Sequence, residues 1–177
     1  MLSRLLGPLA IASCLLLAAC GFEPLYGKRE QAIPTESLLS WVEVPPIKDR
    51  TGQLVRIELT NRMTPTRPAP PSAFTLIVKL NESKASLAVE KDSSATRANL
   101  AIAASFILKQ NGDGLELMTG SVRSVNSYDI LLSDFATLAA ESDARRRGAK
   151  DVADGIVDRL AIFLSRNQQR LSGGPAR

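Results

Sequence analysis

The chain has 177 residues, a formal net charge of +4 at pH 7, no histidine and two cysteines, Cys14 and Cys20. The lack of histidine excludes histidine-based catalytic triads and histidine-ligated metal sites, and two cysteines so close to the N-terminus do not indicate a disulfide framework. The positive charge is small and scattered and aromatic residues are few, so nucleic acid is not an expected partner.

Residues 1–19 have the pattern of a signal peptide. One positive charge precedes an apolar run that is too short for a helical membrane span, which needs about 20 residues. Leu17-Ala18-Ala19 then leads directly to Cys20, and this order matches the lipobox of bacterial lipoproteins. A thiol is nucleophilic enough for the thioether chemistry of lipidation. We therefore expect cleavage before Cys20, with a diacylglycerol and an N-acyl chain on that residue, and no other cofactor.

Cys14 fits the lipobox only loosely, because cleavage before it would leave a shorter hydrophobic region. Removal of residues 1–19 takes away Arg4 and no acidic residue, so the formal net charge of the mature chain is +3. Residues 20–39 are expected to form the lipidated N-terminus and a tether, since Pro24 and Pro34 resist regular structure.

The folded part begins with a predicted strand over residues 40–47, which ends at two prolines. A helix follows, capped by Asp49 or Thr51 and stopped by Pro65. Its expected apolar face comprises Leu54, Val55, Ile57, Leu59 and Met63. A proline-rich connector then leads to the next strand.

Alternation of apolar and polar residues predicts three consecutive strands. The first starts at Phe74 and runs toward a turn at "KDSS", and the second carries alternating apolar residues from Leu100 to Leu108. Asn111-Gly112-Asp113-Gly114 is a strong hairpin signal, because these residues tolerate positive φ. The third strand runs from Leu115 to about Tyr128, so the three strands form an antiparallel meander.

The C-terminal part changes to helical periodicity. Ser133 is the expected N-cap of one long helix that ends at about Asn167, and residues 169–177 are expected to be a flexible tail. Gly148 and Gly155 are unfavourable in a helix and indicate a bend or close packing. The apolar residues recur at spacings of three and four: Phe135, Leu138, Ala139, Ala149, Val152, Ala153, Ile156, Leu160, Phe163 and Leu164.

This order of elements predicts an α+β fold, in which residues 40–168 form a single domain. We expect a two-layer sandwich with two helices packed on a four-stranded mixed sheet in the order β-α-β-β-β-α.

Several segments together resemble the family of the lipopolysaccharide (LPS) assembly lipoprotein LptE, in its alphaproteobacterial form. They are the start "CGFEPLYG", the helix after the first strand, the strand "ATRANLAIAASFIL", the segment "SVNSYDI" and the helix "LAAESDARRRGAKDVADGIVDRLAIFL". The resemblance covers essentially the whole mature chain, and it depends on the order of these segments rather than on one diagnostic motif.

The resemblance implies a role without catalysis. Proteins of this family are anchored in the inner leaflet of the outer membrane, facing the periplasm, and sit partly inside the β-barrel LptD. There they support barrel assembly, plug the pore and help deliver LPS to the cell surface. Gly21 after the lipidated cysteine is consistent with sorting to the outer membrane, and a mildly basic domain suits an anionic, phosphorylated glycolipid.

Two other classes of protein share some of these features. An accessory lipoprotein of an envelope phospholipid transporter, or a secretin pilot, would also have a lipobox and a small α/β domain. An anchored enzyme would need a catalytic pair, for which Asp129, Asp134, Asp151 and Asp154 are the candidates. Asp151 and Asp154 fall among basic residues on the long helix, where solvated charges are far more common than a catalytic dyad.

Two groups of cations are candidate contact residues. Lys91 and Arg97 flank the predicted "DSSA" turn, where they could meet the phosphates of LPS. Arg145, Arg146, Arg147 and Lys150 form the densest basic cluster in the sequence. These four residues either form a solvated helix face that pairs with Glu141, Asp143 and Asp151, or make a basic contact patch for lipid phosphates or the barrel wall.

Overall fold

A computed structural model describes residues 35–64, 71–89 and 95–168. This part of the chain contains a four-stranded sheet and three helices, which confirms the α+β sandwich but adds one helix to the two expected. The elements in chain order are α2 (Thr35–Leu39), β1 (Val42–Glu43), α3 (Asp49–Met63), β2 (Phe74–Val89), β3 (Ala95–Gln110), β4 (Glu116–Asp129) and α4 (Asp134–Arg166).

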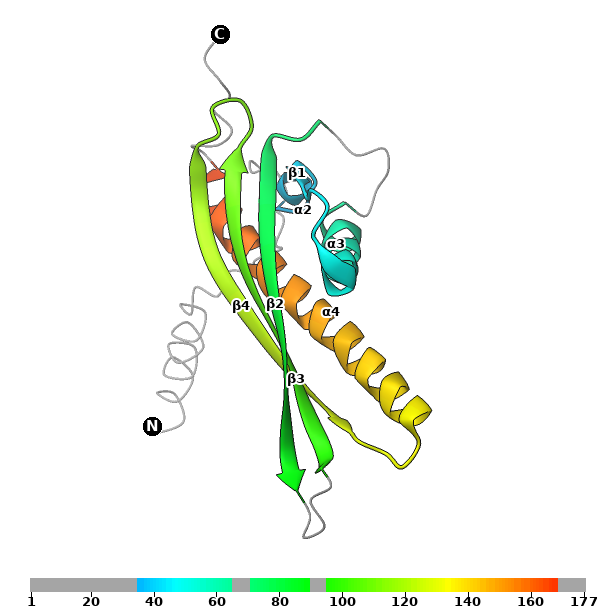
Figure 1. Ribbon diagram of the computed structural model, residues 1–177. Coiled ribbons are helices and arrows are strands. Elements are labelled where there is room, and N and C mark those ends of the chain that lie inside the picture. Colours follow the sequence, from blue (N-terminus) through cyan, green and yellow to red (C-terminus); the bar gives the residue numbers. More distant parts are fainter. Residues whose placement is uncertain (1–34, 65–70, 90–94, 169–177) are drawn as a thin grey trace, which may run out of the picture.

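The sheet has the strand order β1-β2-β3-β4. β1 pairs in parallel with the start of β2, and the other neighbours are antiparallel, so the sheet is mixed as predicted. The β2–β3 hairpin is long and strongly twisted, and its far end extends beyond α3 (Figure 1). The turn between β3 and β4 contains Gly112 and Gly114, both at positive φ, which agrees with the hairpin signal in the sequence.

All three helices lie on one side of the sheet (Figure 1). Alternate strand residues such as Leu76, Phe106 and Leu108 point toward them and are buried, as are Ile156 and Leu160 of α4. A continuous apolar core therefore fills the space between one face of the sheet and the helical layer.

Two glycines let α4 approach the sheet closely. A Cβ atom added at Gly148 would lie 2.9 Å from Cδ1 of Ile102, and one added at Gly155 would lie 2.8 Å from Cγ1 of Val122. These are closer than normal van der Waals contacts, so the glycines serve close packing, which was one of the two roles expected from the sequence.

The beginning of the folded part differs from the prediction. The sequence predicts a tether that includes residues 35–39, but these residues form α2, in which Leu38 and Leu39 are buried in the core. The predicted strand over residues 40–47 is paired only at Val42 and Glu43. Residues 44–47 contribute to packing without strand pairing, because Val44 and Ile47 are buried.

The predicted cap of α3 is also wrong. The N-cap residue is Lys48, which makes no side-chain capping hydrogen bond, and Asp49 follows with φ of 68°. Thr51 donates its hydroxyl hydrogen bond to Glu82 instead. The buried apolar residues of α3 are Val55, Leu59 and Met63, spaced four apart, whereas Ile57 is exposed, so the apolar face is narrower than expected.

The N-terminus of α4 agrees with the prediction, because the amide of Ala136 donates to the side chain of the N-cap Ser133. The expected apolar face, however, is not buried along its whole length. Phe135 is 85% exposed and Leu138 63% exposed, because the first turns of α4 extend past the covered part of the sheet (Figure 1). Among the described residues, the helices lack an apolar stretch long enough to cross a membrane.

Candidate functional site

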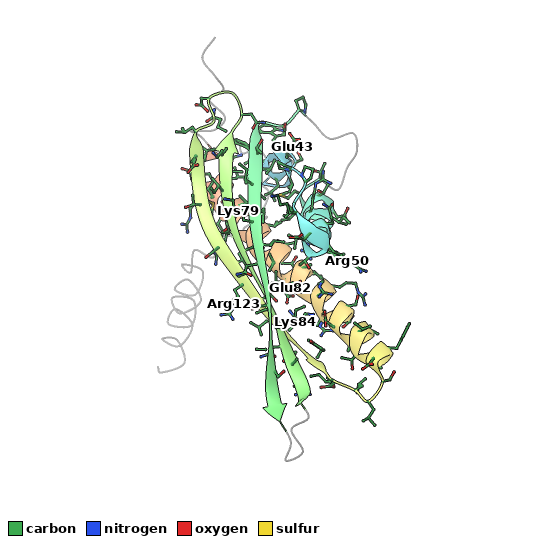
Figure 2. The ribbon with its side chains drawn as sticks, in the orientation of Figure 1. Glu43, Arg50, Lys79, Glu82, Lys84 and Arg123 are labelled. Carbon is green, nitrogen blue, oxygen red and sulfur yellow. The ribbon has the colours of Figure 1, made fainter. Side chains whose placement is uncertain are left out.

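An ion-pair network centred on Arg145 joins α4 to the sheet. Arg145 Nη2 donates to Glu82 Oε1 at 2.8 Å and to Glu141 Oε1 at 2.7 Å, and its Nε donates to Glu82 Oε2 at 3.1 Å. Lys84 Nζ donates to Glu141 Oε1 at 2.5 Å, and Thr51 Oγ1 donates to Glu82 Oε2 at 2.6 Å. Figure 2 shows Glu82 and Lys84 on the side of β2 that faces α4. The network therefore links β2, α3 and α4.

The three central side chains are largely shielded from water, with exposed fractions of 18% for Arg145, 25% for Glu82 and 15% for Glu141. The hydrogen bonds from Arg145 hold the pKa of Glu82 below its ordinary value. The hydrogen bond from Lys84, supported by Arg145, does the same for the pKa of Glu141. The two carboxylates in turn raise the already high pKa of Arg145. All three groups are therefore charged at neutral pH, which suits a structural role rather than proton transfer.

The other members of the predicted basic cluster lie on the outside of α4. Arg146 Nη2 is 3.1 Å from Asp143 Oδ1, and Arg147 also pairs with Asp143. Arg147 Nη2 donates to the main-chain oxygen of Ser127 on the edge strand β4 at 3.2 Å. The pairs of Arg146 and Arg147 with Asp143 are of the kind that the solvated-face interpretation describes. Arg145 differs because it is shielded between the layers, and Asp151 accepts hydrogen bonds from Ser124 and Asn126 of β4 instead. Lys150 is exposed, and no ion pair holds it among the described residues.

The four aspartates considered for catalysis have different surroundings in the fold. Asp129 pairs with Arg97, and Asp134 is in the exposed first turn of α4. Asp151 accepts hydrogen bonds from Ser124 at 2.7 Å and from Asn126 at 3.1 Å, which connect α4 to β4. Asp154 Oδ1 is 2.6 Å from Arg62 Nη2, a close contact of opposite charges that lacks hydrogen-bond geometry. They form no catalytic pair, and no group of residues in the described parts could hold a metal ion.

The end of the molecule that contains the β4–α4 connection combines charged and apolar side chains. We call it the distal end and define it as Arg97, Asp129 and residues 130–138. Arg97 Nε donates to Asp129 Oδ1 at 3.0 Å, and both side chains are exposed. The large apolar residues that are exposed here are Leu131, Leu132, Phe135 and Leu138.

The structure does not bring all of the predicted site residues together. Arg97 is at the distal end, while Arg145 is part of the network between the layers. Cys20 and Lys91 lie outside the described residues, as do the signal peptide and residues 169–177. The sequence does not predict that the apolar side chains of the distal end are exposed, because their helical spacing is the same as that of buried residues.

Known proteins resemble this chain in sequence pattern and fold. A family model described as "LptE: Lipopolysaccharide-assembly" matches residues 39–160, which include most of the folded part. No curated protein matches the chain in sequence.

Solved structures of bacterial lipoproteins share the fold. A lipoprotein from Caulobacter crescentus superposes with a TM-score of 0.63 and 25% sequence identity, over 74% of this chain and 96% of that chain. The minor lipoprotein from Acinetobacter baumannii gives a TM-score of 0.50 and 17% identity, over 68% of this chain and 88% of that chain. Rare lipoprotein B from Shewanella oneidensis gives a TM-score of 0.50 and 11% identity, over 74% of this chain and 96% of that chain.

The pKa values of Glu82 and Glu141 predict how acid affects stability. Their folded-state pKa values are lowered, so the stabilisation is fully present above the unfolded pKa, about 4.3, and is lost as the pH falls through the folded values. Between neutral pH and about pH 3, the wild-type protein should therefore lose more unfolding free energy than the double variant Glu82→Gln with Glu141→Gln. Urea unfolding followed by circular dichroism at both pH values measures this difference.

A matched control removes two other carboxylates, with Glu58→Gln and Asp158→Asn. No ion pair holds either residue among those that the structure describes. The control should lose as much stability on acidification as the wild type. Equal acid sensitivity of all three proteins would show that the Arg145 network does not contribute to stability in the way that its geometry indicates.

Proposed function

Because the chain belongs to the LptE lipopolysaccharide-assembly family, we propose that it partners the LptD β-barrel, plugs the barrel lumen and assists LPS assembly at the outer membrane. The observation that carries this proposal is the family match over residues 39–160. In the proposal, the acyl chains of Cys20 hold the protein in the inner leaflet of the outer membrane, and the folded part faces the periplasm. The protein acts without catalysis, as befits a family of non-enzymatic envelope lipoproteins.

The shape and polarity of the folded part suit a barrel plug. The sheet and α4 form an elongated body that is two layers thick, with one layer of helices on one sheet (Figure 1). The sheet face turned away from the helices carries mostly small and polar side chains, such as Thr75, Ser105 and Ser121. The lumen of a large outer-membrane barrel is polar as well, so the polar side chains of this face can lie against the barrel wall.

The alternative, an accessory lipoprotein of a phospholipid transporter or a secretin pilot, shares the lipobox and a small α/β domain. It does not account for the family match over most of the folded part. The two functions differ in the protein that they require as a partner, and that difference can be measured.

Copurification from the native outer membrane tests the proposed partner. The full, acylated chain should retain LptD through detergent extraction. A plug inside a lumen buries a large interface, and such a complex should not dissociate when detergent extracts and dilutes it. Mass spectrometry of the retained proteins identifies the partner. Recovery of transporter or secretin subunits in place of LptD would contradict the proposal and favour the alternative.

The proposal extends to direct contact with LPS at the distal end. LPS has both phosphates and acyl chains. At the distal end Arg97 is opposite Asp129, the last residue of β4, and the exposed apolar residues Leu132 and Phe135 follow that strand. Lys91, which follows β2 and lies outside the described residues, would add a second cation. A single exposed cation gains little from a phosphate, so several contacts must act together.

Charge reversal at the distal end should therefore weaken LPS binding. Lys91→Glu with Arg97→Glu is expected to reduce binding more than either single change, because both cations contribute to the same phosphates. The binding of purified LPS to the purified protein is the measurement. Copurification with LptD should persist, since Arg97 is exposed, lies outside the buried core and is at one end of the sheet.

Arg146→Glu with Arg147→Glu is the matched control, because these arginines are also exposed and also pair with an aspartate. Equal loss of binding in both double variants would mean that only net charge matters. Unchanged binding in both would remove these residues from LPS recognition and leave the role of barrel partner and plug.

A further inference from the structure

One face of the sheet has no described helix packed on it. We call it the open face and define it as the side chains of odd-numbered residues from Thr75 to Ser83 on β2, from Arg97 to Lys109 on β3, and from Thr119 to Asp129 on β4 together with Glu116. The charges at both ends of this face pair across strands. Arg97 Nε is 3.0 Å from Asp129 Oδ1 at one end, and Lys109 Nζ is 3.2 Å from Glu116 Oε1 at the other.

The charges in the middle of the open face are not paired. Lys79 on β2 and Arg123 on β4 are exposed, and neither takes part in an ion pair or a side-chain hydrogen bond among the residues that the structure describes. Figure 2 shows both on the middle stretch of the sheet, with Arg123 on the side away from α4. No carboxylate of the open face lies between them, so the middle of this face carries two uncompensated positive charges.

A depression of about 550 Å³ lies between these two cations. Its floor is the central strand β3, where the side chains of Ala103 and Ser105 are small. Ser105 is opposite Lys79 on one side and Ser121 on the other, and Ala103 is opposite Asn81 and Arg123. The register therefore places the longer side chains of Lys79 and Asn81 on one side of a shallow floor and that of Arg123 on the other.

The depression is better suited to a partner that covers the whole face than to a small anion that enters the depression. Both cations are exposed, and the attraction of exposed charges to a small anion is weak in water. A broad surface laid over the face would exclude water and strengthen each charge pair. The small side chains of the floor permit close approach, and the apolar residues Ile77, Ile107 and Val125 on the same face would be covered too.

We infer that the open face is the surface through which this protein docks on the wall of its barrel partner, and that Lys79 and Arg123 pair there with carboxylates of that wall. This inference rests on the proposed function, because it names the contact surface for the proposed partner. The charges of the described residues favour an acidic partner surface at one place, since the face pairs its own charges at both ends and leaves the two central cations for an outside acid.

The test is copurification of LptD with the full, acylated chain from outer membranes. Lys79→Glu with Arg123→Glu should reduce the recovered LptD about tenfold or more, because it turns two covered attractions into repulsions. The exchange Lys79→Arg with Arg123→Lys keeps both charges and should retain LptD. Circular dichroism of each purified variant should be unchanged, since both side chains are exposed.

Lys48→Glu with Arg50→Glu is the matched control, because it makes the same charge change at two exposed residues near the start of α3 that no ion pair holds among the described residues. This control should retain LptD. Retention of LptD by the Lys79 and Arg123 reversal, or equal loss in both reversals, would overturn the inference. Loss of LPS binding with LptD retained would also overturn it and identify the occupant as a glycolipid phosphate. Failure of the wild-type protein to retain LptD would instead contradict the proposed function itself.

Discussion

The packing of α4 along one face of the sheet is the constraint on which the rest of the structure depends. α4 is the longest of the described helices and contacts β3, β4, α2 and α3, so it covers a large part of the buried core. Gly148 and Gly155 let it lie close to the sheet. Because the described helices form a single layer, none of them covers the opposite face of the sheet, which can therefore contact another molecule.

The Arg145 network marks where this core ends. On one side of it, α4 buries Ala149, Val152 and Ile156 against the sheet, whereas on the other side Phe135 and Leu138 are exposed. Ion pairs that are only partly shielded suit such a boundary, because their charges keep some access to water while their hydrogen bonds fix the helix to β2. The network thus separates a packed body from a distal end whose apolar side chains are exposed and can contact a ligand or partner.

The two sides of the sheet therefore have different tasks. The covered side supplies stability through apolar burial, and its charges are satisfied within the chain by Glu82, Lys84 and Glu141. The open face supplies little burial, pairs its charges at both ends and leaves Lys79 and Arg123 unpaired among the described residues. A plug in a polar lumen needs this combination, because it must be stable by itself and still present polar groups to a wall.

The sequence predicted the parts of the fold that have a regular pattern. Alternation located β2, β3 and β4, and the Ser133 cap located the start of α4. It did not predict α2, because five residues are too few for a periodic signal. It also placed Phe135 and Leu138 in the core, because periodicity shows which residues share a helix face but not how far the facing sheet extends.

The candidate sites depend on contacts between distant residues, which the sequence pattern does not contain. Arg145 and Glu82 are 63 residues apart, so helical spacing could suggest the pair with Glu141 but not the one with Glu82. Lys79 and Arg123 are placed on either side of β3 by the register of β2 and β4, which their distance in sequence does not reveal. Cys20 could be proposed without a structure, because a lipobox is a local motif.

Depletion of the protein in its native bacterium tests the central claim most directly, with LPS at the cell surface and folded LptD as the two quantities measured. The account predicts that both decrease together, and that expression of the wild-type chain restores both. Normal amounts of surface LPS and folded LptD after complete depletion would contradict it.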